Sequence, residues 1–525
     1  MFAETLYAVG YTSLIASLMI RTVFQHSITG KKIPDNFILI AFITYIVSLF
    51  LNKVTIIDHT WIIPRDILVG LIVWGLSKMF SDHWLWLLGA WGTFVYFHYF
   101  EQLQHSFDDR HQLPATAITA PYSDSEGSID SSAELLFDLN DRHTLAEVEQ
   151  LLQPYQAHLR PAFSLQYADE TDLDDYYVVD IPTTTDWEKI AALLEKSTLT
   201  DDVMPNAMMS ISPIERQQTA TITPPIAAND LPYNDPFANQ QWALQQLHID
   251  QLQHLINQQH IQPTQKVLLA ILDTGVDAAH EDLQANFVST KEQYNKDVVG
   301  HGTHCAGIAA AVSNNSVGIA SAIPSNDFVT VTSIKVLGDN GSGSYETIID
   351  GITEAADKGA AVISMSLGGP DLFGKKRLFN KAIQYANERG AIVVAAAGNS
   401  NRDANKYAPA GCKNVITVAA VDEQLNKASF SNHVSNVPMG IAAPGVGIYS
   451  TIPNNQYTNF SGTSMATPYV AGTVALLKAI RPDMTTAEMY RLLHDTGIET
   501  KNTTETSRFM QPEKALRLLL QQREQ

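Results

Sequence analysis

The stretch Asn459-Phe-Ser-Gly-Thr-Ser464-Met-Ala-Thr-Pro468 decides how the C-terminal half of this chain is interpreted. Gly462 and Thr463 predict a tight bend, and the apolar run after Pro468 predicts a buried helix that Ser464 opens. Unpaired backbone N–H groups and the positive end of the helix dipole lie at such a start, where they favour a developing negative charge. A serine there can be a nucleophile, or it can simply cap the helix.

Two stretches upstream favour the nucleophile. Val267-Leu-Leu-Ala-Ile-Leu-Asp273-Thr-Gly275 predicts a buried parallel strand that ends in a carboxylate. Gly300-His301-Gly-Thr-His304-Cys-Ala-Gly307 predicts a second small-residue helix with a histidine in its first turn. A serine nucleophile needs a base with a pKa near neutrality, and the base needs a carboxylate that orients it. Asp273, His301 and Ser464 can supply these three groups.

The motifs DTG, HGTHCAG and GTSMATP, in this order, resemble those of the subtilase family of serine peptidases. The resemblance covers roughly residue 234 to the C-terminal helix, a little over half of the chain. It implies a serine endopeptidase with Asp273, His301 and Ser464 as its triad. It also implies that Asn399, in a Gly-Asn-Ser segment, holds the oxyanion together with the Ser464 backbone N–H. From its local sequence alone, Asn399 can equally be a turn residue.

Strand and helix patterns alternate through the C-terminal half. Apolar, β-rich runs at 267–272, 329–336, 361–366, 392–396 and 415–421 predict strands, and residues 345–358 and 375–389 predict helices. The alternation predicts, over residues 234–525, an α/β domain with a parallel sheet and helices on both faces. Active sites in such sheets lie at the carboxyl ends of strands, where Asp273, Ser366 and Asn399 fall.

Two glycine-containing segments resemble the substrate-binding segments of the family. The resemblance implies that six residues pair with an extended peptide as added edge strands, namely Gly341, Ser342, Gly343, Ser366, Leu367 and Gly368. The implied partners are therefore protein or peptide substrates. No acidic residue that would bind a Lys or Arg side chain is evident, which favours an apolar residue before the scissile bond.

The resemblance also implies a structural Ca²⁺. Asp282 and the loop Ser313-Asn-Asn315-Ser-Val317-Gly-Ile319 resemble the strong calcium site of the family, and Asp235 can add a carboxylate. Hard oxygen ligands, some of them backbone carbonyls, suit this ion. The same loop can also be an ordinary turn.

Cys305 gives the chain a resemblance to the thiol-containing, proteinase K-like branch, in which the thiol lies near the catalytic histidine without attacking. A cysteine nucleophile is the competing interpretation. Cys412, His304 and Asp277 are interpreted as structural residues. With two cysteines in all, the chain offers no disulfide framework and the redox compartment stays undecided.

Residues 1–101 predict a membrane module of about four transmembrane helices. Uncharged apolar runs lie between Glu4 and Arg21, Asp35 and Lys53, Asp66 and Lys78, and Asp82 and Glu101. Most approach the ~20 residues that span a bilayer. Basic residues in the first loop favour an outside N-terminus and an extracytoplasmic catalytic domain, whereas loss of the third span would reverse the orientation. Buried helices of a soluble domain are the alternative.

A flexible acidic tether is predicted at 102–132, and an α+β domain at 133–212. Strands at 134–139, 163–167, 176–181 and 206–211 and helices at 143–155 and 186–196 give a β-α-β-β-α-β order, which suggests a ferredoxin-like domain. Its position resembles that of the subtilase propeptide, which implies an intramolecular inhibitor of the cleft. A plain spacer domain is the alternative. Residues 213–233 predict a proline-rich linker and processing region.

The sequence thus predicts a multi-domain protein, a membrane-tethered serine endopeptidase made as a self-inhibited precursor in the cell membrane. A catalytically silent subtilase fold that serves as a binding or sensor module is the alternative, and an enzyme that faces the cytoplasm is a third. The net charge of −21 lies mostly in the acidic segment after the membrane module, which argues against binding to nucleic acid.

Overall fold

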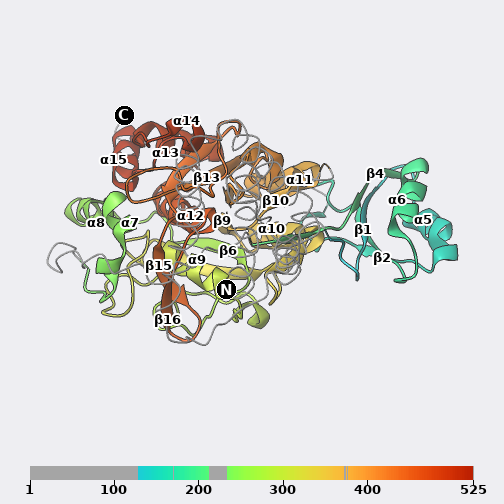
Figure 1. The fold of residues 1–525 in the computed structure, drawn as a ribbon, viewed down its shortest axis with the longest axis horizontal. Coiled ribbons are helices and arrows are strands. Elements are labelled where there is room, and N and C mark those ends of the chain that lie inside the picture. The colour runs from blue at the N-terminus through green and yellow to red at the C-terminus, as the bar shows by residue number, and fades with distance from the viewer. Residues whose placement is uncertain (1–127, 169–170, 212–232, 372–373, 375, 524–525) are drawn as a thin grey trace, which may run out of the picture. The chain divides into compact units, whose positions relative to one another are not determined.

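The computed structural model describes residues 128–168, 171–211, 233–371, 374 and 376–523 (Figure 1). The predicted membrane spans and most of the tether lie outside the described residues. Within the described ranges, no helix has both the length and the apolar character needed to cross a membrane.

A six-stranded parallel sheet forms the centre of the C-terminal domain, with strand order β14-β13-β11-β9-β6-β7. The strands are β6 Val267–Asp273, β7 Val329–Lys335, β9 Ala360–Met365, β11 Ile392–Ala396, β13 Val415–Val421 and β14 Gly440–Pro444. The five predicted strands are all present. The prediction missed β14, because Gly-Ile-Ala-Ala-Pro is short and begins and ends with residues that usually interrupt strands.

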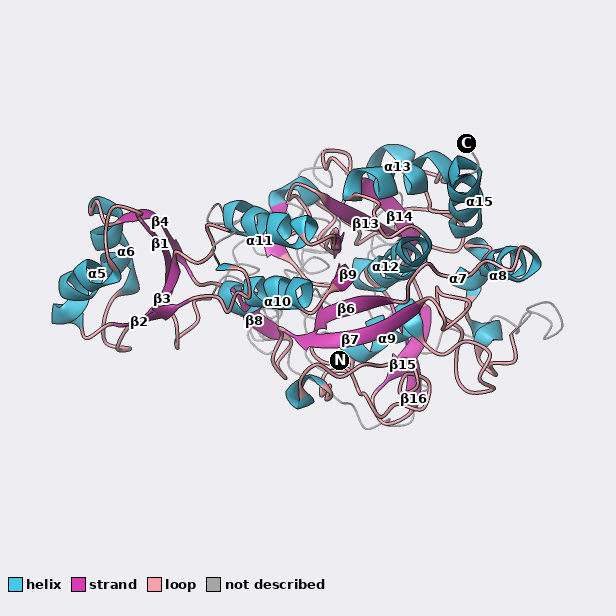
Figure 2. Ribbon diagram, turned by 180° about the vertical axis from the view of Figure 1, so that it is seen from behind, coloured by secondary structure: helices cyan, strands magenta, loops and turns pink. Residues whose placement is uncertain are grey.

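Helices cover both faces of this sheet, as predicted (Figure 2). In β6, Leu269 and Ile271 belong to one buried cluster while Ala270 and Leu272 belong to the other, because successive side chains of a strand point to opposite faces. The first cluster contains the helices α9 His301–Ala310 and α12 Thr463–Ile480. The second contains α10 Tyr345–Asp357 and α11 Lys376–Glu388.

The helices α9 and α12 are buried along their whole length, and small residues let α9 pack closely against its neighbours. A Cβ atom at Gly302 would lie 2.1 Å from the carbonyl oxygen of Gly275, so only glycine lets α9 approach the end of β6 this closely. Gly300, which precedes α9, has a φ of 87°. These glycines bring the first turn of α9 against the carboxyl end of β6.

The order of the strands reverses at β6. The chain passes from β6 to its neighbour β7 on one side and then returns to β9 on the other side. In open α/β sheets the crevice at such a reversal is the usual ligand site. Asp273 ends β6 and Ser366 directly follows β9, so both residues lie at this crevice.

The remaining elements of the C-terminal domain surround this core. They are α7 Trp242–Gln246, α8 Ile249–Gln258, β8 Ser342–Ser344, β10 Gly369–Pro370, β12 Tyr407–Ala408, β15 Ile448–Ile452, β16 Gln456–Phe460, α13 Thr486–Thr496, α14 Thr503–Thr506 and α15 Pro512–Arg523. The hairpin of β15 and β16 leads directly into the bend before α12.

The N-terminal described domain has the element order β-α-β-β-α-β. Its elements are β1 Leu135–Leu139, α5 Leu145–Leu152, β2 His158–Pro161, β3 Tyr176–Asp180, α6 Trp187–Lys196 and β4 Thr200–Pro205. They form an antiparallel sheet in the order β2-β3-β1-β4. Leu135 and Phe137 pack with the helices on one face, whereas Leu136 joins the cluster that contains α10 and α11.

Two predicted strands of this domain are corrected. Residues 163–167 form no strand, because the backbone N–H groups of Ser164 and Gln166 donate to the carboxylates of Asp350 and Asp357 on α10. The predicted last strand, 206–211, does not belong to the domain's sheet. The sheet is completed by β4, and β5 Met208–Ser210 pairs instead with β8 of the C-terminal domain.

Candidate active site

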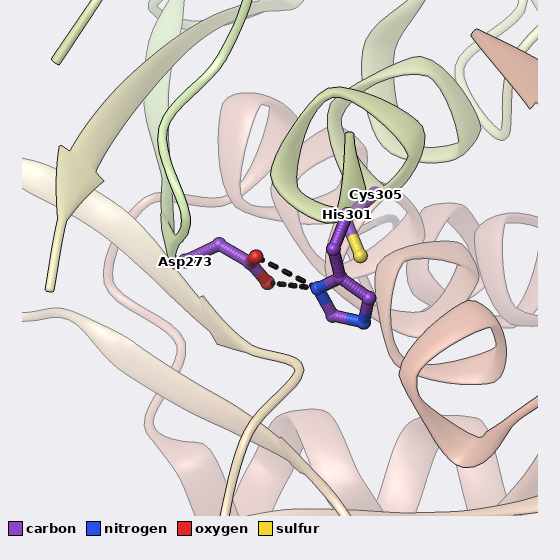
Figure 3. Close-up of side chains that lie close together, drawn as sticks. All are labelled: Asp273, His301 and Cys305. Atoms are coloured by element: carbon purple, nitrogen blue, oxygen red, sulfur yellow. Dashed lines mark hydrogen bonds and ion pairs between the residues drawn. The ribbon is translucent and has the colours of Figure 1, made fainter. Parts of the chain in front are cut away.

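Asp273 and His301 form a hydrogen-bonded pair that has no exposed side-chain surface (Figure 3). His301 Nδ1 lies 2.7 Å from Oδ1 and 2.9 Å from Oδ2 of Asp273. A carboxylate only accepts, so Nδ1 carries the proton and Nε2 keeps its lone pair. Within the described part of the chain, Nε2 has no hydrogen-bond partner. The imidazole is therefore arranged as a base.

Asp297 links the segment that follows Asp273 to the first turn of the helix that carries His301. The sequence analysis did not identify this residue. One of its oxygens accepts from Thr274 Oγ1 (2.9 Å) and Gly300 N (2.8 Å), and the other accepts from N (2.9 Å) and Oγ1 (2.7 Å) of Thr303. Burial raises the pKa of Asp297. Its only sequence signal is an acidic residue four positions before His301, in a loop that matches no motif.

Ser464 lies in the first turn of α12, where Pro468 changes its hydrogen bonding. A proline nitrogen has no hydrogen, so the Ser464 carbonyl lacks its normal partner four residues on. It accepts instead from Ser366 Oγ at 2.8 Å. In return, Ser464 Oγ donates to the Ser366 carbonyl oxygen at 3.0 Å. These two hydrogen bonds thus fix Ser464 beside the end of β9.

Cys305 is fully buried and lies close to Asp273 and His301 (Figure 3). Its Sγ lies 3.5 Å from the carbonyl oxygen of Ser464. Burial raises the pKa of the thiol well above its ordinary value, and the charge of Asp273 raises it further. Because the thiolate is the reactive form, this environment disfavours a cysteine nucleophile.

Asn399 is oriented by Thr463, the residue before Ser464. Its Oδ1 accepts from Thr463 N at 2.9 Å and from Thr463 Oγ1 at 2.8 Å. The amide therefore presents its Nδ2 donors on the opposite side, near Gly462. This arrangement suits an oxyanion donor, and it also explains why an asparagine amide, with both an acceptor and donors, is needed there.

The two predicted substrate segments lie on either side of Ser210, which pairs with Ser342 in one of them and forms a bridge with Gly368 in the other. Gly341 to Gly343 lie in or next to β8, and Ser366 to Gly368 connect β9 to β10. A pocket beside Ser464 has no charged side chain among its lining residues, which are Ser366, Leu367, Gly368, Ala396, Ala397, Gly398, Tyr407, Ala408 and Ser464. Tyr407 and Ala408 were missed because they come from a segment without a motif.

The residues predicted to bind calcium lie around one loop, 313–319, which both Asp235 and Asp282 contact. Asp282 accepts from Asn315 Nδ2 and from Ile319 N, both at 2.8 Å. Asp235 accepts from the backbone N–H groups of Asn314 (2.8 Å) and Asn315 (3.0 Å). Val317 lies between these residues and donates its N–H to Asn315 Oδ1 at 2.7 Å. Both carboxylates are buried, and burial raises the pKa of Asp282 to about 7. Each of these contacts is an N–H group that donates to a carboxylate or amide oxygen, and such oxygens are the ligand type that a hard cation prefers.

His304 and Asp277 have the contacts expected of structural residues. His304 is fully buried, stacks on Phe460, and has Nε2 3.1 Å from the carbonyl oxygen of Thr458. Asp277 Oδ2 accepts from Asn454 N at 2.9 Å. Neither residue points into the cleft beside Ser464 as a lining residue.

Comparison with known proteins agrees with this geometry. The model of the Subtilase family (Peptidase S8) matches residues 264–512. The chain is 48% identical over 214 residues to thermitase of Thermoactinomyces vulgaris, which covers 40% of this chain and 74% of thermitase. It is 43% identical over 238 residues to subtilisin DY of Bacillus licheniformis, which covers 44% of this chain and 83% of that protein. A solved protease structure from Pseudoalteromonas arctica, 29% identical, covers 55% of this chain and 99% of its own, with a TM-score of 0.48.

A parallel α/β domain with this buried histidine–carboxylate pair and these relatives defines a serine-type endopeptidase, which acts on proteins or peptides. The chain belongs to the subtilase family.

Proposed function

We propose that Ser464, His301 and Asp273 are the nucleophile, the base and the orienting carboxylate of peptide-bond hydrolysis. The buried hydrogen bond between His301 and Asp273 carries this proposal. Ser464 Oγ turns from the Ser366 carbonyl to His301 Nε2 and attacks the substrate carbonyl as Nε2 takes its proton. The imidazolium, stabilised by Asp273, then gives that proton to the leaving nitrogen as the C–N bond breaks, which leaves the acyl group on Ser464 Oγ. Water, deprotonated by His301 Nε2, attacks this ester, and the proton returns to Ser464 Oγ as the acid product leaves. Nδ2 of Asn399 and the Ser464 backbone N–H hold the oxyanion.

A fluorophosphonate probe tests this assignment, because it phosphonylates only an activated serine. Wild-type protein should incorporate one probe at Ser464, located by peptide mass spectrometry, and Ser464→Ala should incorporate none. A folded wild-type C-terminal domain that incorporates no probe would favour the alternative, a silent binding or sensor module.

In this proposal the N-terminal domain, residues 128–211, inhibits the enzyme by occupying the cleft beside Ser464. Its support is the pairing of Met208 to Ser210 with β8 and the bridge between Ser210 and Gly368. Extended peptides bind sheet edges in this manner. An uncut chain in which these residues occupy the cleft cannot admit a substrate, so the protein is made as a self-inhibited precursor.

Calcium and the membrane complete the proposal. A Ca²⁺ ion bound through Asp235, Asp282, the Asn315 side chain and the carbonyls of Val317 and Ile319 would supply the positive charge that two buried carboxylates need. The apolar runs in 1–101 support a multi-pass anchor in the cell membrane with the catalytic domain outside the cytoplasm. A topology reporter fused after Glu101 tests the orientation.

A further inference from the structure

Two crossed hydrogen bonds join the segment after β6 to the first turn of α9. The hydroxyl of Thr274, in the first segment, accepts from the backbone N–H of Gly302 at 3.0 Å. The hydroxyl of Thr303, in the helix, accepts in turn from the backbone N–H of Asp277 at 3.0 Å. Each segment therefore uses a threonine hydroxyl to hold the backbone of the other.

These threonine contacts lie directly beside the histidine–carboxylate pair. Thr274 follows Asp273 and Gly302 follows His301, so one of the contacts joins the two residues next to the pair. Thr274 N also donates to Asp273 Oδ1 at 2.7 Å, so a movement of Thr274 would turn the carboxylate. The distance of 2.7 Å between His301 Nδ1 and Asp273 Oδ1 is therefore coupled to the threonine contacts.

Asp297 orients both threonine hydroxyls. Each hydroxyl has a single proton, and both protons are donated to the Asp297 carboxylate, from Thr274 Oγ1 at 2.9 Å and from Thr303 Oγ1 at 2.7 Å. The lone pairs of the two oxygens are then free to face the backbone N–H groups of the opposite segment. The crossed hydrogen bonds therefore depend on an acceptor at position 297.

This acceptor has to be an ionised carboxylate, because both of its oxygens accept. One oxygen also accepts from Val299 N at 3.1 Å and Gly300 N at 2.8 Å, and the other from Thr303 N at 2.9 Å. The described groups that act most strongly on this buried charge are hydrogen-bond donors and the negative Asp273, and none is a cation. Surrounding donors offset the cost of such a charge. An asparagine would have one acceptor oxygen and would turn its amide N–H groups toward some of these donors.

We propose that Asp297 is a positioning residue of the peptidase, which sets the geometry of the histidine–carboxylate pair through the two threonine hydroxyls. This inference rests on the proposed function. A displacement of about 1 Å in an active site can lower the rate about 100-fold. Because the threonine contacts act on the pair and not on the segments that bind substrate, kcat should depend on Asp297 and KM should not.

Asp297→Asn tests the inference in the full chain, with Asp277→Asn as the matched control. The Asp277 carboxylate accepts from Ala279 N and Asn454 N, so this control leaves the threonine contacts in place. Each chain is first incubated with the same small amount of tagged wild-type protein, which is then removed, so that slow self-processing does not hide an active domain. A fluorophosphonate counts the reactive serines, and a chromogenic peptide gives kcat per reactive serine and KM.

We expect Asp297→Asn to lower kcat about 100-fold and to leave KM within about threefold of wild type. Asp277→Asn should keep both constants within about threefold of wild type. A residue that only stabilised the fold would change the melting temperature and the number of reactive serines, but it would not change kcat per reactive serine.

A second pair of variants tests the inference even if Asp297→Asn does not fold. Thr303→Val removes the hydroxyl that links Asp297 to the N–H of Asp277, and Thr303→Ser keeps it. We expect Thr303→Val to lower kcat at least about tenfold and Thr303→Ser to stay within about threefold of wild type. In the Asp297→Asn chain, Thr303→Val should have little further effect, because both changes act through one network.

The other results overturn the inference in distinguishable ways. A normal kcat per reactive serine in Asp297→Asn or in Thr303→Val would make Asp297 a structural residue and leave the peptidase assignment intact. Equal losses in Thr303→Val and Thr303→Ser, or in Asp297→Asn and Asp277→Asn, would also overturn it. If wild type neither hydrolyses the peptide nor reacts with the fluorophosphonate, the proposed function fails, and the inference fails with it.

Discussion

The Nδ1 atom of His301 lies 2.7 Å from Oδ1 of Asp273, and solvent reaches neither side chain. The carboxylate therefore selects one tautomer of the imidazole, and in the proposed reaction it would offset the positive charge that forms on the ring. Both residues are rigidly held, because Thr274 N also donates to Asp273 and Asp297 fixes the turn before His301.

Asp273→Asn should lower kcat by about 10⁴-fold with little change in KM, because an amide can bind the wrong imidazole tautomer and cannot balance the imidazolium charge. A chromogenic peptide assay on protein with an unchanged melting temperature measures the loss. A decrease below tenfold would remove Asp273 from the proposed triad.

Ser464→Ala should abolish hydrolysis, whereas Cys305→Ala should retain activity within about tenfold of wild type. The raised pKa of the buried Cys305 thiol leaves little thiolate to act as a nucleophile. The Cys305→Ala variant tests whether the contact between Cys305 Sγ and the Ser464 carbonyl oxygen only helps to position Ser464. If Ser464→Ala kept activity that a thiol reagent inhibits, Cys305 would be the nucleophile instead.

A chelator should lower the melting temperature of the Ser464→Ala protein, because the proposed calcium ion would bind only the folded loop. Free Ca²⁺ at 100 times its Kd adds about 2.7 kcal/mol to the free energy of unfolding. Asp282→Ala should melt at the same temperature with and without chelator. The control is Asp483→Ala, which changes a carboxylate that is 80% exposed and should keep the full response. A chelator response that persists in Asp282→Ala would place the ion elsewhere.

The sequence predicted the catalytic domain well because its strongest patterns are local. The run Val267 to Asp273 has the composition of a buried strand, and Gly300 to Gly307 consists, apart from its two histidines, of small residues that suit a close helix contact. Asp273, His301, Ser464 and Asn399 lie in such runs or directly after them. Because the strands and helices were predicted correctly, the places of these four residues in the fold were predicted correctly as well.

The N-terminal domain was predicted less well, because the segments that were predicted wrongly take their structure from contacts with the C-terminal domain. The order of elements and the cap of α6 by Asp186 follow from local sequence. Residues 163–167 look like a strand, but the N–H groups of Ser164 and Gln166 donate to aspartates that lie 186 and 191 residues further along the chain. Asp297 was missed for a similar reason, since its role depends on a loop geometry that spacing alone does not reveal.

The free energy of unfolding should fall as the pH decreases from 6.5, in part because of His304. Burial lowers the pKa of His304 to about 3 in the folded protein, whereas a histidine in the unfolded chain titrates near 6.5. Between these values the unfolded state binds one more proton, so acid favours unfolding by up to about 1.4 kcal/mol per pH unit. The contribution is fully present above pH 6.5.

Urea unfolding of the Ser464→Ala protein between pH 7 and 5 measures this slope. His304→Phe keeps a ring to stack on Phe460 and should reduce the slope, whatever its effect on stability at pH 7. His494→Phe serves as the matched histidine substitution, because the His494 side chain is 36% exposed and lies away from Phe460 in the sequence. Equal slopes in His304→Phe and the parent would show that His304 does not contribute to the acid sensitivity.

A segment of residues 128–211 added in trans should inhibit the separate 234–525 domain, and its tail should supply most of the affinity. Without Met208 to Ile211 the segment loses the pairing with β8 and the burial of two apolar side chains, about 3–6 kcal/mol, so Ki should rise more than 100-fold. Arg160→Ala removes only an ion pair with Glu346. Because the Arg160 side chain is 51% exposed, this pair is worth about 1 kcal/mol or less, and Ki should rise less than tenfold.

Inhibition is measured as the loss of initial rate on a chromogenic peptide, and circular dichroism checks that each segment is folded. If the shortened segment inhibited as strongly as the full one, the contacts of the N-terminal domain with α10 and α11 would be sufficient for inhibition. Inhibition would then arise without occupation of the cleft beside Ser464. A much weaker Ki for the shortened segment, together with a small effect of Arg160→Ala, is the pattern expected of a tail that competes directly with substrate.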